Sequence, residues 1–167
     1  MSGSYNFLLH IIAFGMLAGT FLPSYILDRK LRAEPDYGRK LYIGGLMRTF
    51  SIFVPINAAL LLLTGIGNIH NRLLDAPYAW YDEGWLVAKI ICFAVLVVNG
   101  FTFGRIFAVK RIMLIKAVAE KNPPSDAESK IAGYNKKISI LFLVQTALIL
   151  AILYLATFGS AKHPGQF

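Results

Sequence analysis

The sequence predicts an all-α integral membrane protein: a four-transmembrane-helix bundle with both termini on the outer, periplasmic side. Composition is the first reason, because 56% of the 167 residues are hydrophobic and the mean hydropathy is +0.57, whereas soluble domains are usually about 45–50% apolar. The second reason is that charge is confined to blocks between long apolar runs. Each run reaches the roughly 20 residues that a helix needs to cross a bilayer core. We expect one membrane domain over residues 1–167.

Four apolar runs define the expected spans. Helices are expected because a backbone in lipid must satisfy its own hydrogen bonds, and the runs are too long for barrel strands. Pro55 should kink the second helix. The spans cover about residues 6–27, 49–69, 85–109 and 137–159.

The third and fourth helices should extend beyond the membrane. Strong helix formers continue past residue 107, and Asn122-Pro123-Pro124 should end the third helix. The capping-box pattern Ser125-Asp126-Ala127-Glu128 should begin the fourth. The sequence therefore predicts a cytoplasmic helical hairpin at about residues 107–136.

The distribution of Lys and Arg predicts the orientation. The first and third connections are basic, and such connections stay in the cytoplasm; they hold Arg29, Lys30, Arg32, Arg39, Lys40, Arg48, Lys110, Arg111, Lys116, Lys121, Lys130, Lys136 and Lys137. In the second connection Arg72 is the only basic residue, beside the acidic residues Asp75, Asp82 and Glu83. The tail holds only Lys162. The expected location is the inner membrane of a bacterium. The basic residues build no separate domain, which argues against a nucleic-acid partner.

His10 is the first candidate functional residue. It lies about one turn inside the first span, on one helical face with Phe14, Leu17, Phe21 and Ser24. An imidazole there can hydrogen-bond a neighbouring helix, but a titratable group inside a membrane is a functional hypothesis by default. Neutral imidazole ligates haem iron and also suits copper or zinc. Phe14 and Leu17 would then contact a flat macrocycle.

Two further side chains belong to this hypothesis. Lys89 lies about one turn inside the outer end of the third span, at a depth similar to that of His10, and can meet it if the two helices are neighbours. Alternatively, Lys89 extends its ammonium to the outer head groups. His70, at the outer end of the second span, is either a solvated interfacial residue or a second metal ligand beside His10.

Several of these segments resemble one membrane-protein superfamily. They are Leu9-His10 and Leu17-Ala18-Gly19-Thr20-Phe21-Leu22 in the first span, Arg48-Thr49-Phe50 and Leu63-Thr64-Gly65 around the second, and Gly84-Trp85-Leu86 with Lys89 in the third. This pattern is similar to the HemJ-type protoporphyrinogen oxidases and the CopD copper-resistance membrane domain, over roughly the first two thirds of the chain. HemJ-like relatives usually have Trp where this chain has Met16, and they often have His where it has Val87. These differences concern the oxidase reaction rather than the fold.

The resemblance implies bound haem b with His10 as axial ligand. It places Lys89 near the macrocycle or its propionates, or makes it essential to an oxidase-type reaction. The first hypothesis is therefore a b-type-haem-binding membrane protein with a redox role, passing electrons toward a quinone or another membrane redox partner. The alternatives are a CopD-like copper protein using His10 and His70, and a cofactor-free accessory subunit of a membrane complex. A homo-oligomer is compatible with all three.

Overall fold

The computed structural model of the chain describes residues 2–73 and 80–159, and all regular structure in these two ranges is helical. This part of the chain contains four helical rods that are long and apolar enough to cross a membrane, over Tyr5–Ala33, Tyr37–His70, Gly84–Ala119 and Ala127–Gly159. The predicted all-α architecture, with four helices long and apolar enough to span a membrane, is thereby confirmed. Asp75 and Lys162 lie outside the described residues, as does the side chain of Arg72.

The four rods are divided into shorter elements. The first is α1 (Ser2–Ala33), and the second consists of α2 (Tyr37–Ser51) and α3 (Phe53–Leu73). After the short helix η1 (Trp80–Asp82), the third rod runs through α4 (Gly84–Val98), the π-helix η2 (Asn99–Gly104) and α5 (Arg105–Ala119). The fourth is α6 (Ala127–Tyr154), which ends in the short π-helix η3 (Leu155–Gly159).

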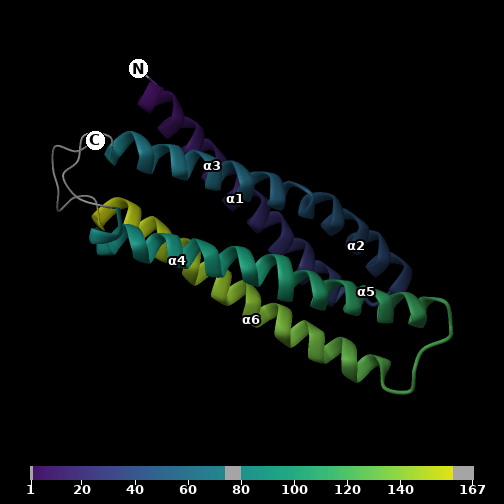
Figure 1. Ribbon diagram of the computed structural model, residues 1–167. Helices are drawn as coiled ribbons and strands as arrows, with labels where there is room; N and C mark the ends of the chain where they lie inside the picture. Colours follow the sequence, from purple (N-terminus) through teal and green to yellow (C-terminus); the bar gives the residue numbers. More distant parts are fainter. Residues whose placement is uncertain (1, 74–79, 160–167) are drawn as a thin grey trace.

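Successive rods form two helical hairpins. In the first, α1 packs against α2 and α3, and in the second, α6 packs against α4 and α5. Figure 1 shows the hairpins side by side, with α2 of the first next to α5 of the second. Any site between the hairpins therefore receives side chains from distant parts of the sequence.

The second rod is interrupted where Pro55 predicts a kink. The helix breaks at Ile52, between α2 and α3. Proline has no N–H to donate to the carbonyl four residues earlier, and its ring collides with that carbonyl. The affected carbonyl belongs to Ser51, the last residue of α2, so the position of the break follows from the proline.

The bundle has two separate apolar cores. The core toward the termini contains Ala13, Leu17, Leu61, Leu96 and Ile152. The other, toward the α1–α2 and α5–α6 turns, is built around Leu31, Ile115 and Ile131, with partly buried side chains from α2 such as Leu41 and Met47. The second core means that the turn end of the bundle is a packed four-helix structure in its own right.

The first basic connection is mostly helical, which the sequence analysis did not predict. α1 continues to Ala33 and α2 begins at Tyr37, so only residues 34–36 link them. The carboxylate of Asp36 accepts a hydrogen bond from the backbone N–H of Arg39 at 2.7 Å and caps α2. The amphipathic α2 then contributes to the second core.

The turn between α5 and α6 corrects one detail of the prediction. α6 does begin in the expected segment, at Ala127, but the expected capping box is wrong. The N-cap residue is Asp126, and its side chain makes no capping hydrogen bond. Its carboxylate instead pairs with the Lys130 ammonium at 2.7 Å, so Ser125 is left one position before the cap.

α5 ends in a hydrogen-bonded C-terminal motif. The backbone N–H of Asn122 donates to Ala117 at 3.0 Å, and that of Lys121 donates to Val118 at 3.1 Å. This Schellman arrangement requires a left-handed residue, normally glycine, just past the helix end. Here Lys121 occupies that position with φ 58°.

Candidate functional site

His10 lies on α1 with its ring against α3. Its Nδ1 is 2.8 Å from the Thr64 hydroxyl oxygen. The ring also crosses Gly65, where an added Cβ would be 3.5 Å from the His10 Cε1. A small residue at position 65 thus lets the imidazole approach α3 closely enough to reach Thr64.

The hydrogen bonds of Thr64 favour one tautomer of His10. The Thr64 hydroxyl donates to the carbonyl of Leu60 at 2.6 Å, and a hydroxyl has one hydrogen to donate. With the hydroxyl donating to Leu60, it accepts from His10, and the neutral ring then carries its proton on Nδ1. The Nε2 atom then carries the free lone pair, as required of a histidine that binds a metal through Nε2.

A second polar contact holds α1 and α3 in register one turn further out. The Asn6 amide donates to the carbonyl of Thr64 at 2.9 Å and to the Asn68 side chain at 2.6 Å. The helices are close here, since a Cβ on Gly67 would lie 2.9 Å from the Asn6 amide nitrogen. These bonds orient α1 and thereby the His10 ring.

Lys89 approaches the same region from the second hairpin. It is half-buried in the first turns of α4, and its ammonium is close enough to act electrostatically on the His10 ring. Within residues 5–70 and 80–159, the Lys89 side chain makes no hydrogen bond or ion pair. The structure therefore places Lys89 within electrostatic range of His10, although no hydrogen bond joins the two side chains.

Phe14 and Leu17 lie deeper along α1. Leu17 is buried within the apolar core toward the termini, and the half-buried Phe14 packs against that core. The inner side of the His10 region is therefore apolar.

His70 is not brought to His10. It is exposed and comes five residues after Gly65, about 7 Å further along α3 at 1.5 Å per residue. Among the described residues there is also no group of three or more His, Cys, Asp or Glu side chains that could hold a metal ion. The arrangement offers His10 as a single imidazole ligand.

Sequence reasoning missed a buried polar cluster at the other end of the bundle. Asp28 and Arg111, each 1% exposed, form an ion pair at 2.6 Å between α1 and α5. Arg111 also donates to Asn135 of α6 at 3.0 Å, and Arg32 contacts both Asp28 and Ser139. The available signal was Asp28 itself, an acidic residue directly after an apolar span.

Comparisons with models of known protein families, with curated proteins and with solved structures gave no match to this chain.

Proposed function

We propose that this chain is a b-type-haem-binding membrane protein with a redox role, with Nε2 of His10 as an axial ligand of the iron. The observation that carries the proposal is the hydrogen-bonded series from His10 through Thr64 to Leu60, which favours the tautomer with an unprotonated Nε2. A metal-ligating histidine usually donates its other ring N–H to a fixed acceptor, which orients the ring and makes it a better ligand.

The contacts of His10 also support the resemblance to HemJ-like proteins. The segments Leu9-His10 and Leu63-Thr64-Gly65 carry that resemblance in the first and second spans, and they lie against each other through His10. Lys89, from the third resembling segment, lies within electrostatic range of His10. Two parts of the sequence that match the pattern thus meet in the fold, and the third acts on them through its charge.

The residues present fit a haem group in charge as well as in ligand type. Haem would supply one-electron chemistry at its iron, with a potential set by the axial ligand and nearby charge. His10 would hold the iron, and the Lys89 ammonium would stabilise a propionate or an anionic substrate. Phe14 and Leu17 would keep water from the inner side, which strengthens these interactions.

We further propose that the turn end of the bundle faces the cytoplasm of a bacterium and both termini face the periplasm. Residues 28–51 and 105–137 hold 14 Lys and Arg against six Asp and Glu, so they carry the full net charge of +8. Basic connections are retained on the cytoplasmic side. His10 and Lys89 would then lie in the outer half of the inner membrane.

The test is an absorption spectrum of the detergent-purified protein after expression with ample haem. Wild type should show a Soret band and the reduced bands of haem b, and His10→Ala should lose them. His70→Ala is the matched control, because it removes an exposed imidazole from the neighbouring helix and should leave the spectrum unchanged.

Two results would count against this function. A colourless wild-type protein would remove haem and bring forward the accessory-subunit hypothesis. Equilibrium copper binding that is lost in both histidine variants would favour the copper alternative, although the separation of His10 and His70 argues against a shared site.

A further inference from the structure

A cavity of about 210 Å³ lies between the two hairpins. Its walls come from every rod: Leu17 and Thr20 from α1, Val54 and Ala58 from the second rod, and residues from α4 to α6 on the other side. This volume is many times larger than the space that a single water molecule needs. Packed interiors have few voids larger than one water molecule, so this is more than a packing defect. His10 does not line it.

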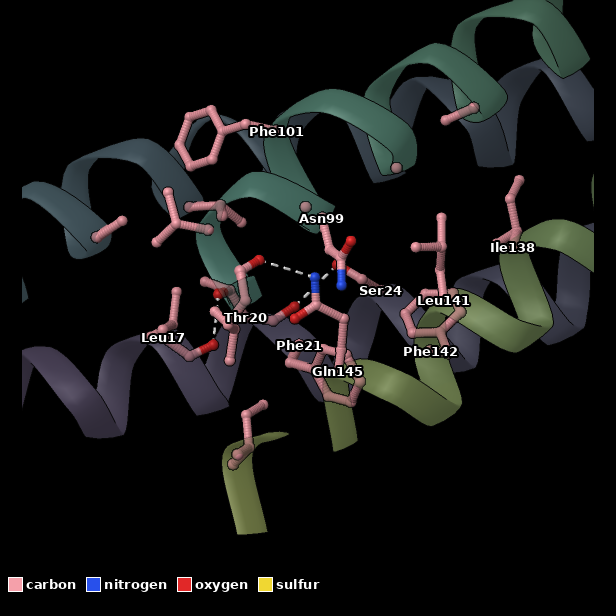
Figure 2. Close-up of a pocket in the computed structure, with 18 of the residues that line it drawn as sticks. Leu17, Thr20, Phe21, Ser24, Asn99, Phe101, Ile138, Leu141, Phe142 and Gln145 are labelled. Atoms are coloured by element: carbon pink, nitrogen blue, oxygen red, sulfur yellow. Dashed lines mark hydrogen bonds between the residues drawn. The ribbon is translucent and has the colours of Figure 1, made fainter. Parts of the chain in front are cut away.

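The π-helix η2 shapes one wall of this cavity. At the start of η2, the Gln145 amide of α6 donates to the carbonyl of Leu96 at 3.1 Å. The two elements are close here, since a Cβ on Gly100 would lie 3.3 Å from the Gln145 amide nitrogen. Such π-turns are frequent at functional sites. Figure 2 shows that Asn99 and Gln145 lie beside each other at the cavity.

Most polar groups on the wall already have protein partners. The Thr20 and Ser24 hydroxyls donate to carbonyls of their own helix at 2.8 Å each. Arg111 is bound to Asp28 and Asn135. The exception is Asn99, whose side chain makes no hydrogen bond within the described ranges. Its amide offers both donors and an acceptor.

The side-chain oxygen of Gln145 adds a second acceptor to the wall. The hydrogen bond to Leu96 uses only its amide nitrogen. The remaining lining is largely hydrocarbon, with Phe21, Leu141 and Phe142 on the side opposite η2. The cavity thus combines neutral hydrogen-bonding groups with apolar walls, and its one cation is neutralised by Asp28.

We propose that this cavity binds the head group of a neutral, membrane-soluble molecule that carries carbonyl or hydroxyl oxygens. An apolar pocket with a few convergent polar groups is the usual form of a small-molecule site. Amide groups select a neutral polar head, whereas a charged head would need a free counter-charge. Phe101 lines the cavity and is 40% exposed on the outer surface of the bundle, so an attached apolar tail can extend into lipid past this residue.

A quinone and a neutral glycerolipid both have this chemistry, and the experiment separates them. Purified protein is equilibrated with decylubiquinone or with 1-oleoylglycerol, and the bound ligand is quantified by mass spectrometry after gel filtration. Asn99→Leu should weaken binding of the correct ligand about tenfold, because it removes the unpaired amide. Thr102→Val, an exposed position on the same π-helix, should leave binding unchanged.

A second variant tests the cavity itself. Ala108→Phe places a large side chain on the wall and should abolish binding, with a thermal unfolding curve recorded to confirm that the variant is folded. Each variant is measured with and without haem, so the result does not depend on the proposed function of His10. Failure of both probes to bind wild type would overturn the proposal. So would binding that is unaffected by both Asn99→Leu and Ala108→Phe.

Discussion

The Thr64 hydroxyl favours the tautomer of His10 in which Nε2 is available to a ligand. Thr64→Val keeps the shape of the side chain but removes the acceptor for the Nδ1 proton, so the ring loses its orientation. We expect haem affinity to fall about 10- to 100-fold, the usual effect of losing such a partner, when haem is titrated into the haem-free protein and followed at the Soret band. Thr146→Val is the control, because that exposed hydroxyl bonds only its own helix. Equal affinities for the two variants would refute the role of Thr64.

The ion pair between Asp28 and Arg111 should be costly to break from one side. Asp28→Asn leaves a buried guanidinium without its counter-charge, and such losses reduce the free energy of unfolding by about 3–5 kcal/mol. Denaturant unfolding in detergent measures this. Asp126→Asn, which breaks the solvent-exposed pair with Lys130, should change the free energy of unfolding far less, because water screens exposed ion pairs.

A double variant distinguishes the loss of a pair from the loss of a side chain. Asp28→Leu combined with Arg111→Met removes both charges and should recover most of the lost stability, because an apolar pair of similar volume is often as stable as a buried ion pair. A double variant as unstable as Asp28→Asn would show that the contacts of Arg32 and Asn135 require the charges of Asp28 and Arg111.

At the scale of the elements, the backbone at the end of α5 is strained because a residue other than glycine occupies a left-handed position. Lys121 has φ 58°, where a side chain costs about 1 kcal/mol that glycine avoids. Lys121→Gly should therefore raise the free energy of unfolding by nearly that amount. Lys110→Gly, at an exposed site inside α5, should instead lower it by about 0.5–1 kcal/mol. A destabilised Lys121→Gly protein would contradict this account of the turn.

The elements also show what the sequence could and could not predict. Run length and hydropathy predicted four helices correctly, and Pro55 predicted the break in the second. The extension of the first hairpin through α2 was missed, because its basic residues were attributed to a connection, although Asp36 was available as a capping signal. The π-helix η2 has no simple sequence pattern, since its extra residue is accommodated by packing against Gln145.

For the whole molecule, the decisive prediction concerns sidedness. In a Cys92→Ala background, Tyr81→Cys lies at an exposed site before α4 and Ser125→Cys at the α5–α6 turn. A membrane-impermeant maleimide should label position 81 from the periplasmic side. Position 125 should react only after the inner membrane is permeabilised. The opposite pattern would invert the proposed orientation and place His10 on the cytoplasmic side.

The candidate site could be predicted only in part, because its partners depend on how the helices are arranged. The sequence identified His10 and Lys89 from their depth in the spans. It gave Thr64 as part of the resembling segment Leu63-Thr64-Gly65 and did not pair it with His10, since that pairing depends on which helices are neighbours. Asp28 and Arg111 were missed for the same reason: they are 83 residues apart, and only the packing of α1 against the second hairpin brings them together.

The separation of Asp28 and Arg111 along the chain also determines the order in which the two charges are synthesised. At a synthesis rate of about 5–20 residues per second, Arg111 follows Asp28 from the ribosome after roughly 4 to 17 seconds. The first hairpin therefore reaches the bilayer before the second can neutralise Asp28. During this interval Arg32, one helical turn after Asp28, has already been synthesised, whereas Arg111 has not. Arg32 is thus placed to pair with the Asp28 carboxylate before Arg111 has been synthesised.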